Sequence, residues 1–210
     1  MYPRYFKAPF ITPEQTWAEA DRIRSKYWPS NTLPVEVEEI LWQVGLRLEP
    51  VASLKNDGDV DALLLTGALT RIIVDLEEYM DDRMLNRMRF SIAHELGHFI
   101  LHGDLYRKIN HASVEDWIEF VQAVPEDQYN YVEQHAYEFA GRLLVPSDRL
   151  KQELTHAVKK AEKAGFIDWD KSGDAAREYI ASSVCRIFGV SSLVVEKRII
   201  REQLLPPVCG

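Results

Sequence analysis

The sequence predicts an α+β fold in which a short run of strands separates two runs of helices. Three segments, at 46–51, 61–66 and 70–75, are short, rich in aliphatic residues and bounded by turn-forming sequences, as strands are. From residue 83 onward, apolar residues recur with helical spacing almost to the end of the chain. Because strands and helices do not alternate, we expect a small antiparallel sheet packed against helices.

The helices that precede the strands are predicted from their end signals. Thr12, Pro13 and Gln15 supply an N-cap, a first-turn proline and a capping-box partner, so the first helix begins there. A second helix over 35–44 ends at Gly45, which is suited to a helix C-terminus. The helices that follow the strands are predicted at 83–102, 113–124, 128–144, 147–163, 173–188 and 192–204.

Length and charge limit the organisation of the chain and its partners. The 210 residues suffice for one well-buried domain with a small addition. We therefore divide the chain into a core of residues 1–146 and a helical C-terminal extension of residues 147–210. The formal net charge of −8 argues against a protein whose whole surface binds nucleic acid or an anionic membrane. No apolar run approaches the roughly 20 residues that cross a bilayer.

The expected location of the protein is the cytoplasm. The N-terminal sequence MYPRYFKAPFITPEQ lacks the apolar segment of a secretion signal. Cys185 and Cys209 lie far apart in the sequence and lack the spacing of a metal-binding pair. We therefore expect two reduced thiols, with Cys185 as a small core residue.

The segment RFSIAHELGHFILH (89–102) carries the strongest functional signal, an H-E-x-x-H motif. His94 and His98 are four residues apart, so on a helix they share one face and can reach one cation. Glu95 lies about 100° around the helix from His94, where it can face a water on that cation. Two imidazoles and a carboxylate base are what a hydrolytic zinc site requires. The alternative is an ordinary amphipathic helix with surface histidines.

A catalytic zinc site needs a third protein ligand. His102 lies about 12 Å along the helix from His94, which is too far to share one ion, so a supporting or capping role is expected. Glu133, on the helix predicted at 128–144, is the better candidate. That helix can approach the first one closely because it carries the small residues Ala136, Ala140 and Gly141.

These motifs resemble those of the ImmA/IrrE family of metallopeptidases. The resemblance is carried by RFSIAHELGHFILH, by the E-x-x-A sequence that begins at Glu133 and by FAGRLLVP (139–146). It extends outward to LPVEVEEILWQVGLRLEPV before the motif and to FGVSSLVVEKRI near the end. The resemblance implies a zincin-like metallopeptidase core in which His94, His98 and Glu133 bind zinc and Glu95 is the general base.

The resemblance also implies an intracellular zinc endopeptidase that cleaves or inactivates a helix-turn-helix repressor, as family members that release stress genes do. One position departs from the family pattern. Tyr137 stands where the family usually has Asn or Asp, whose short side chain can hold a ligand histidine by a hydrogen bond. Weaker metal retention or altered activity would follow from that difference.

Several alternatives stay open at this point. A non-catalytic module could hold a repressor in the same cleft. The segment 175–202 has a helix-turn-helix outline, and a DNA-binding regulator would use its cations Lys197, Arg198 and Arg201, although the acidic chain favours structural packing. The same ligand set accepts manganese or iron as well as zinc. Candidates for an oxyanion stabiliser are His111, Tyr131 and His135.

Overall fold

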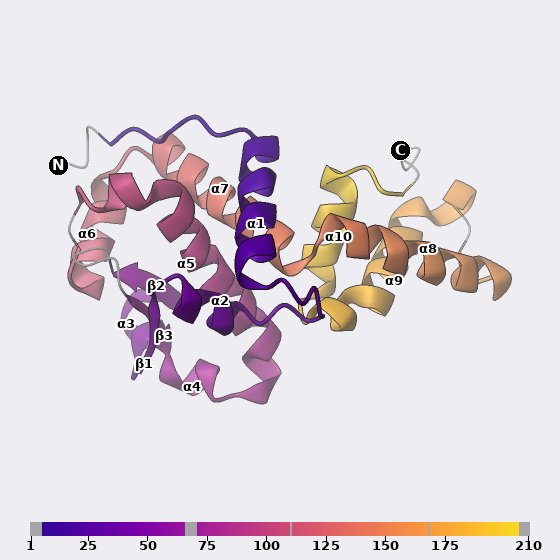
Figure 1. The fold of residues 1–210 in the computed structure, drawn as a ribbon, viewed down its shortest axis with the longest axis horizontal. Coiled ribbons are helices and arrows are strands. Elements are labelled where there is room, and N and C mark those ends of the chain that lie inside the picture. The colour runs from indigo at the N-terminus through magenta and orange to yellow at the C-terminus, as the bar shows by residue number, and fades with distance from the viewer. Residues whose placement is uncertain (1–5, 66–70, 110, 168, 206–210) are drawn as a thin grey trace. The chain divides into compact units, whose positions relative to one another are not determined.

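The computed structural model describes the chain outside residues 1–5, 66–70, 110, 168 and 206–210 (Figure 1). The chain divides into two compact units, one of residues 1–31 and 36–143 and the other of residues 32–35 and 144–210. The structure is mostly helical with one small sheet, which confirms the predicted α+β fold class. The strand ends expected at Thr66 and Thr70, and Cys209, lie outside the described residues.

Most elements belong to the first unit. In chain order they are α1 (Pro13–Tyr27), α2 (Val37–Gln43), β1 (Arg47–Val51), α3 (Leu54–Gly58), β2 (Ala62–Leu65), β3 (Arg71–Asp75), α4 (Leu76–Tyr79), the 3₁₀ turn η2 (Asp82–Met84), α5 (Leu85–Tyr106), α6 (Val114–Ala123) and α7 (Glu126–Leu144). The second unit contains α8 (Ser147–Lys163), α9 (Trp169–Phe188) and α10 (Ser192–Arg201).

The sheet is mixed, so the expectation of an antiparallel sheet was wrong. Its strand order is β1-β3-β2. β2 runs antiparallel to β3, with Ala62 opposite Val74, but β1 runs parallel to β3, with Arg47 opposite Arg71. A parallel pair needs a crossover connection. Here α3 and β2 together form that connection, and α3 is too short to produce a helical period in the sequence.

β2 lies at the edge of the sheet, on the side that contacts α5 (Figure 1). The backbone N–H of Asp75 donates to the carbonyl oxygen of Asp61, which marks that pair as hydrogen-bonded. Since pairs alternate along an antiparallel ladder, Ala62 and Leu64 direct their backbone groups away from β3. All four residues of β2 are buried, and Ala62, Leu63 and Leu64 line a cavity beside α5.

The helix ends follow the sequence signals at α1 and depart from them at α5. Thr12 and Gln15 form the expected capping box, with reciprocal N–H···O distances of 3.3 and 2.9 Å. Gly45 has a φ of +87°, the left-handed conformation expected at the end of α2. α5 continues past the predicted stop at residue 102. Gly103 is part of the helix, which ends only after Tyr106.

Arg198, one of the cations considered for DNA binding, is packed inside the second unit. Arg198 of α10 is only 3% exposed and is bound to Glu202, which also accepts a hydrogen bond from Ser147. A buried arginine in an ion pair cannot reach a DNA groove. Cys185 of α9 is half-buried with its Sγ near the carbonyl oxygen of Ser182, so its expected place in the core was wrong.

One further property concerns helix length. Within the residues that the structure describes, no single helix has the length and apolar character needed to cross a membrane. The segment Gly173–Phe188 and α10 pass that test only as a pair, by length and composition, and the pair is bent by 112°.

Asp75 joins the sheet to two short helices, and we predict that it stabilises the fold in a pH-dependent way. Its carboxylate accepts hydrogen bonds from the backbone N–H groups of Lys55, Glu77 and Glu78 at 2.9 to 3.1 Å. Burial alone would raise the pKa of Asp75, but these hydrogen bonds outweigh it and lower the pKa. A depressed folded-state pKa contributes stability above the unfolded pKa of about 4, and that contribution is lost as the pH falls below it.

We therefore expect Asp75→Asn to lower the free energy of unfolding by about 1–3 kcal/mol at pH 7, because an amide cannot accept all three bonds. The difference from wild type should shrink between pH 5 and pH 3. Urea unfolding across that range measures it, with Asp82→Asn at an exposed position as the control. An equal effect at pH 3 and pH 7 would contradict the assignment.

Candidate metal centre and active site

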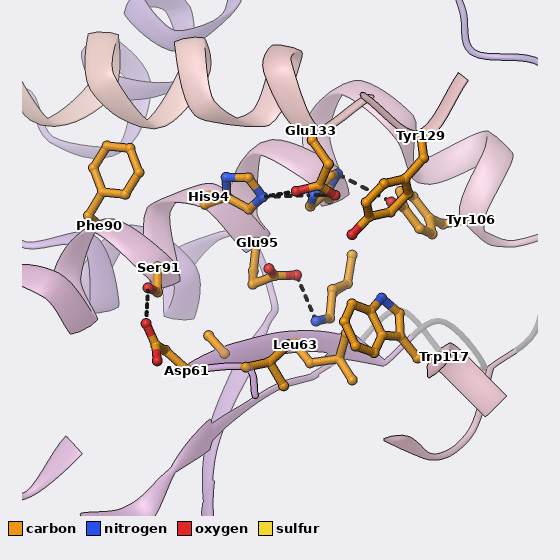
Figure 2. A pocket seen from close by; sticks show the side chains of 14 residues that line it. Asp61, Leu63, Phe90, Ser91, His94, Glu95, Tyr106, Trp117, Tyr129 and Glu133 are labelled. Atoms are coloured by element: carbon orange, nitrogen blue, oxygen red, sulfur yellow. Dashed lines mark hydrogen bonds and ion pairs between the residues drawn. The ribbon is translucent and has the colours of Figure 1, made fainter. Parts of the chain in front are cut away.

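α5 and α7 bring two imidazoles and a carboxylate to one point. His94 and His98 lie one turn apart on α5, and Glu133 faces them from α7 (Figure 2). The Nε2 atoms of the two histidines are 3.0 Å apart. The Glu133 oxygens lie 3.2 Å from His94 Nε2 and 3.3 Å from His98 Nε2. The structure thus brings together the three residues predicted as metal ligands.

These spacings fit a single divalent ion. Ligand atoms bound about 2.05 Å from one tetrahedral ion lie about 3.3 Å from each other. The two Nε2 atoms are separated by about this distance, and each has one Glu133 oxygen at about this distance, Oε2 for His94 and Oε1 for His98. Two imidazole nitrogens at 3.0 Å are ordinary partners of one ion, since each can direct its lone pair at it. Ligand atoms of His94, Glu95 and His98 also lie within 4.8 Å of one another, so the cluster could hold a metal. Glu133 is the candidate third ligand because its oxygens lie 3.2 and 3.3 Å from the two Nε2 atoms, whereas Glu95 is bound to the backbone of Leu64.

The electrostatics of the cluster favour a cation. Burial alone would raise the pKa of Glu133, but the adjacent His98 and His94 lower it strongly, so the carboxylate is ionised. Burial alone would lower the pKa of His98, but the negative charges of Glu133 and Glu95 outweigh it and raise the pKa. The negative charge that draws a proton to His98 would also attract a metal ion.

Glu95 is held apart from the ligand set by the edge strand. It is 9% exposed, and its Oε2 accepts the backbone N–H of Leu64 at 2.8 Å. This is one of the N–H groups that β2 directs away from β3. Burial raises the pKa of Glu95 above its usual value, although the two histidines and the Leu64 hydrogen bond partly oppose that rise. A carboxylate with a raised pKa beside a metal position can accept a proton.

The close packing of α5 and α7 depends on Gly97, within the motif itself. A Cβ atom at Gly97 would lie 3.1 Å from the Cα of Ala136 and 3.2 Å from its carbonyl oxygen. It would also lie 3.2 Å from the ring of Phe139. Backbone atoms cannot rotate away as a side chain can, so any larger residue at position 97 must push the two helices apart. The sequence predicted small residues on α7, but not this contact.

His102 supports His98 and does not reach the ligand cluster. Its Nδ1 lies 3.3 Å from His98 Nδ1, and its Nε2 lies 3.3 Å from His135 Nδ1. His135 in turn makes a hydrogen bond to the backbone of Ile11, which raises its pKa although burial lowers it overall.

The proton positions of the three rings are linked through these contacts. If His135 donates from Nε2, its neutral Nδ1 accepts from His102 Nε2–H, and His102 Nδ1 must then accept from His98 Nδ1–H. Burial and the neighbouring histidines lower the pKa of His102 to about 2, so it is neutral and can both donate and accept. A His98 ring that donates from Nδ1 can bind a cation through the lone pair of its Nε2, the nitrogen that faces Glu133. The hydroxyl of Tyr106, 3.4 Å from His98 Nδ1, is a second partner for the same proton.

The ligand cluster opens into a cavity of about 270 Å³ that is walled by β2 and α5 and by residues of α6 and α7. In Figure 2, Phe90 and Ser91 lie at one end of the cavity and Trp117 and Tyr129 at the other. The Tyr129 hydroxyl points into the cavity beside Glu133. Burial and the Glu133 carboxylate raise the pKa of Tyr129, so the hydroxyl keeps its proton and can donate a hydrogen bond.

The candidate oxyanion residues from the sequence do not line this cavity. His111 is buried against Phe120, Tyr131 is 54% exposed, and His135 belongs to the chain that supports His98. Tyr106 and Tyr129 line it instead. Tyr106 lies on the face of α5 that carries His94 and His98, because it continues the four-residue series 94, 98, 102. Tyr129 lies on the face of α7 that carries Glu133, because it precedes Glu133 by four residues. The four-residue spacing was the signal that could have found them.

Tyr137 packs against the ring of Phe90, with ring centroids 4.9 Å apart. Phe90 and Tyr137 are each one turn from the cluster, before His94 on α5 and after Glu133 on α7. The position that departs from the family pattern therefore holds an aromatic pair at one end of the site.

Comparison with known protein families identifies the family of the chain. The model of the Peptidase_M78 family, described as the IrrE N-terminal-like domain, matches residues 79–199, which is more than half of the chain. The match includes α5 and α7 with the cluster described above and continues to α10. No curated protein matches the chain.

We predict that Gly97→Ala weakens metal binding at least tenfold and destabilises the protein by about 1–3 kcal/mol, because the added methyl group forces α5 away from α7. Gly103→Ala on the same helix is the matched control, since a Cβ there meets nothing within 4 Å. That change should stabilise the protein by up to about 1 kcal/mol and leave metal affinity unchanged. Chelator competition and urea unfolding measure the two quantities. Equal metal affinities for the two variants would show that Gly97 does not set the helix distance.

Proposed function

Because the chain belongs to the Peptidase_M78 family of metallopeptidases, whose members resemble ImmA and IrrE, we propose that it is a zinc-dependent endopeptidase acting on one regulatory protein. The observation that carries this proposal is the convergence of His94, His98 and Glu133 beside the buried Glu95. We propose a helix-turn-helix repressor as the substrate, which places the reaction in the cytoplasm.

The proposed metal ligands are His94 Nε2, His98 Nε2 and a Glu133 oxygen. Two imidazoles and one carboxylate suit zinc better than magnesium or calcium, which prefer oxygen ligands alone. A zinc ion held there would lower the pKa of a bound water and polarise the carbonyl of the bond to be cleaved. Three protein ligands leave the fourth tetrahedral position for that water.

Glu95 is the proposed general base. It takes a proton from the attacking water and transfers it to the departing amine, so that the carboxylate is regenerated in each cycle. Its raised pKa suits this role, because a carboxylate of ordinary pKa is a weak base near neutral pH. Binding to Leu64 N–H keeps Glu95 at the edge of the cavity, outside the ligand triangle.

β2 offers a template for the peptide. Ala62 presents its backbone groups along the cavity and Leu64 its carbonyl group, while the Leu64 N–H is held by Glu95. An extended segment can therefore lie beside this strand and pair with the remaining groups. Such pairing requires a stretch of substrate without stable structure of its own. We therefore propose that the substrate is cleaved in an exposed loop or linker, within its chain and not at its end. The core of residues 1–146 would carry out this cleavage, with residues 147–210 as its helical extension.

Tyr129 is the proposed donor to the oxyanion that develops on the scissile carbonyl. It keeps its proton and lines the cavity beside Glu133. Tyr106 is less suited to that role because its hydroxyl lies against His98 Nδ1, on the side of the ring away from the ligand cluster.

The first test is cleavage of a candidate repressor by wild type and by Glu95→Gln. We expect Glu95→Gln to lose at least a hundredfold in kcat and to keep its zinc, because the amide cannot accept the proton of the water. His94→Ala should lose both zinc and activity, measured by elemental analysis of the purified proteins. Equal activity of wild type and Glu95→Gln would exclude Glu95 as the base. Zinc content and tight repressor binding without cleavage by the wild type would support a binding module instead.

The second test concerns the oxyanion donor. We expect Tyr129→Phe to lower kcat about a hundredfold with little change in KM or zinc content, because the hydroxyl acts mainly in the transition state. Tyr131→Phe on the same helix is the matched control, since its ring is exposed and lies outside the cavity. A change in KM alone, or a loss that Tyr131→Phe reproduces, would rule out the assignment.

A further inference from the structure

An apolar cluster lies against one face of β2, beside the cavity of the metal centre. Alternate residues of a strand point to opposite faces of its sheet. On one face, Leu63 and Leu65 of β2 pack with Leu54 of α3 and Ile73 of β3, and all four side chains are buried. Leu63 also lines the cavity, so the cluster and the cavity meet at the edge of β2.

The cluster is open on the side of the cavity. Val60, Val114 and Trp117 pack against its buried members but are themselves only half-buried. Val60 and Trp117 also line the cavity. In Figure 2 the Trp117 ring lies at the end of the cavity away from Ser91. An apolar wall that belongs to the cluster therefore faces the space beside the metal position.

A peptide paired with β2 would bring its own side chains to this wall. A segment that pairs with an edge strand continues the sheet, so its alternate side chains project from the same two faces. Every second side chain then projects from the face of Leu63, where Val60 and Trp117 form the wall of the cavity. An apolar side chain placed there removes its own surface and that of the wall from water.

The charges of the cavity do not call for a charged side chain. Among the described residues that line it, the charged groups other than Asp61 are the three proposed metal ligands and Glu95. Asp61 is already ion-paired, with Lys55 at 2.9 Å and with Arg87 at 2.6 Å. A charged side chain of the substrate would lose water at this wall without gaining a counterion. The lining thus favours an uncharged, apolar side chain.

We propose that Val60, Leu63 and Trp117 form a subsite for a large apolar side chain of the substrate, at one fixed position near the cleaved bond. This inference rests on the proposed peptidase function, because the peptide paired with β2 is what carries the side chain to the subsite. Trp117 is the main determinant, since a large aromatic ring offers the most apolar contact area. It lies on α6, which carries neither a proposed metal ligand nor the base, so changing it alters the choice of substrate and not the chemistry.

The test is digestion of a mixture of short, unstructured synthetic peptides in which all amino-acid types are equally frequent, with the cleavage sites read by mass spectrometry. We expect wild type to prefer Leu, Ile, Met or Phe about tenfold at one position relative to the cleaved bond. Trp117→Ala should remove most of that preference. Trp42→Ala is the matched control, since Trp42 is 78% exposed on α2 and lies outside the cavity, and it should keep the preference.

Val60→Glu adds a carboxylate to the wall and should replace the apolar preference by one for Lys or Arg at the same position. A folding defect lowers all cleavage alike and cannot create a new preference. In a second measurement, the same peptides are passed over zinc-loaded Glu95→Gln, and the retained peptides are identified. Retention of peptides rich in large apolar residues, without cleavage of any peptide by wild type, would refute the peptidase and support the subsite.

Three results would overturn the subsite. The first is that neither the cleaved nor the retained peptides favour an apolar residue. The second is that Trp117→Ala keeps the preference of wild type, or loses it only to the extent that Trp42→Ala does. The third is that Val60→Glu leaves the preference unchanged.

Discussion

The close approach of α5 and α7 at Gly97 is the contact on which the candidate active site depends. His94 and His98 are positioned by α5 alone, but Glu133 reaches them only because the backbone of α7 lies against a residue without a side chain. A displacement of a few tenths of an ångström would move Glu133 out of the spacing that one ion requires, since metal–ligand distances tolerate little variation. The glycine in HELGH is therefore a packing requirement of the metal site.

The same two helices also carry the side chains that support His98, a candidate metal ligand. His135 of α7 lies 3.3 Å from His102 of α5, and His102 lies 3.3 Å from Nδ1 of His98. These contacts hold the His98 ring on the side away from Glu133. His102, for which the sequence predicted a supporting or capping role, and His135, a candidate oxyanion residue in the sequence, both belong to this support, and neither needs to contact a metal.

The sequence was sufficient where local rules apply and insufficient where the answer depends on packing in three dimensions. The capping box at Thr12 and the helical positions of His94 and His98 follow from residue type and spacing. Glu133 could be proposed because small residues on its helix indicated close packing. The parallel pairing of β1 with β3 could not be proposed, since α3 is too short to produce a helical period in the sequence. Tyr129 was also missed. Its four-residue spacing from Glu133 places it on the same helix face, but only the packing of β2, α5, α6 and α7 shows that this face lines a cavity.

Tyr137 shows how this chain differs from its family pattern in a way that the fold accommodates. An Asn or Asp there could hold a histidine by a hydrogen bond, but the tyrosine ring packs on Phe90, one turn from His94. Orientation of the ligands is then carried by two other constraints. His98 is oriented by the hydrogen bond with His102, and His94 by its contact with Glu133 and by the rigid packing of α5 against α7. Packing between α5 and α7 thus orients the histidines in place of the polar side chain of the family pattern, and Gly97 makes this packing possible.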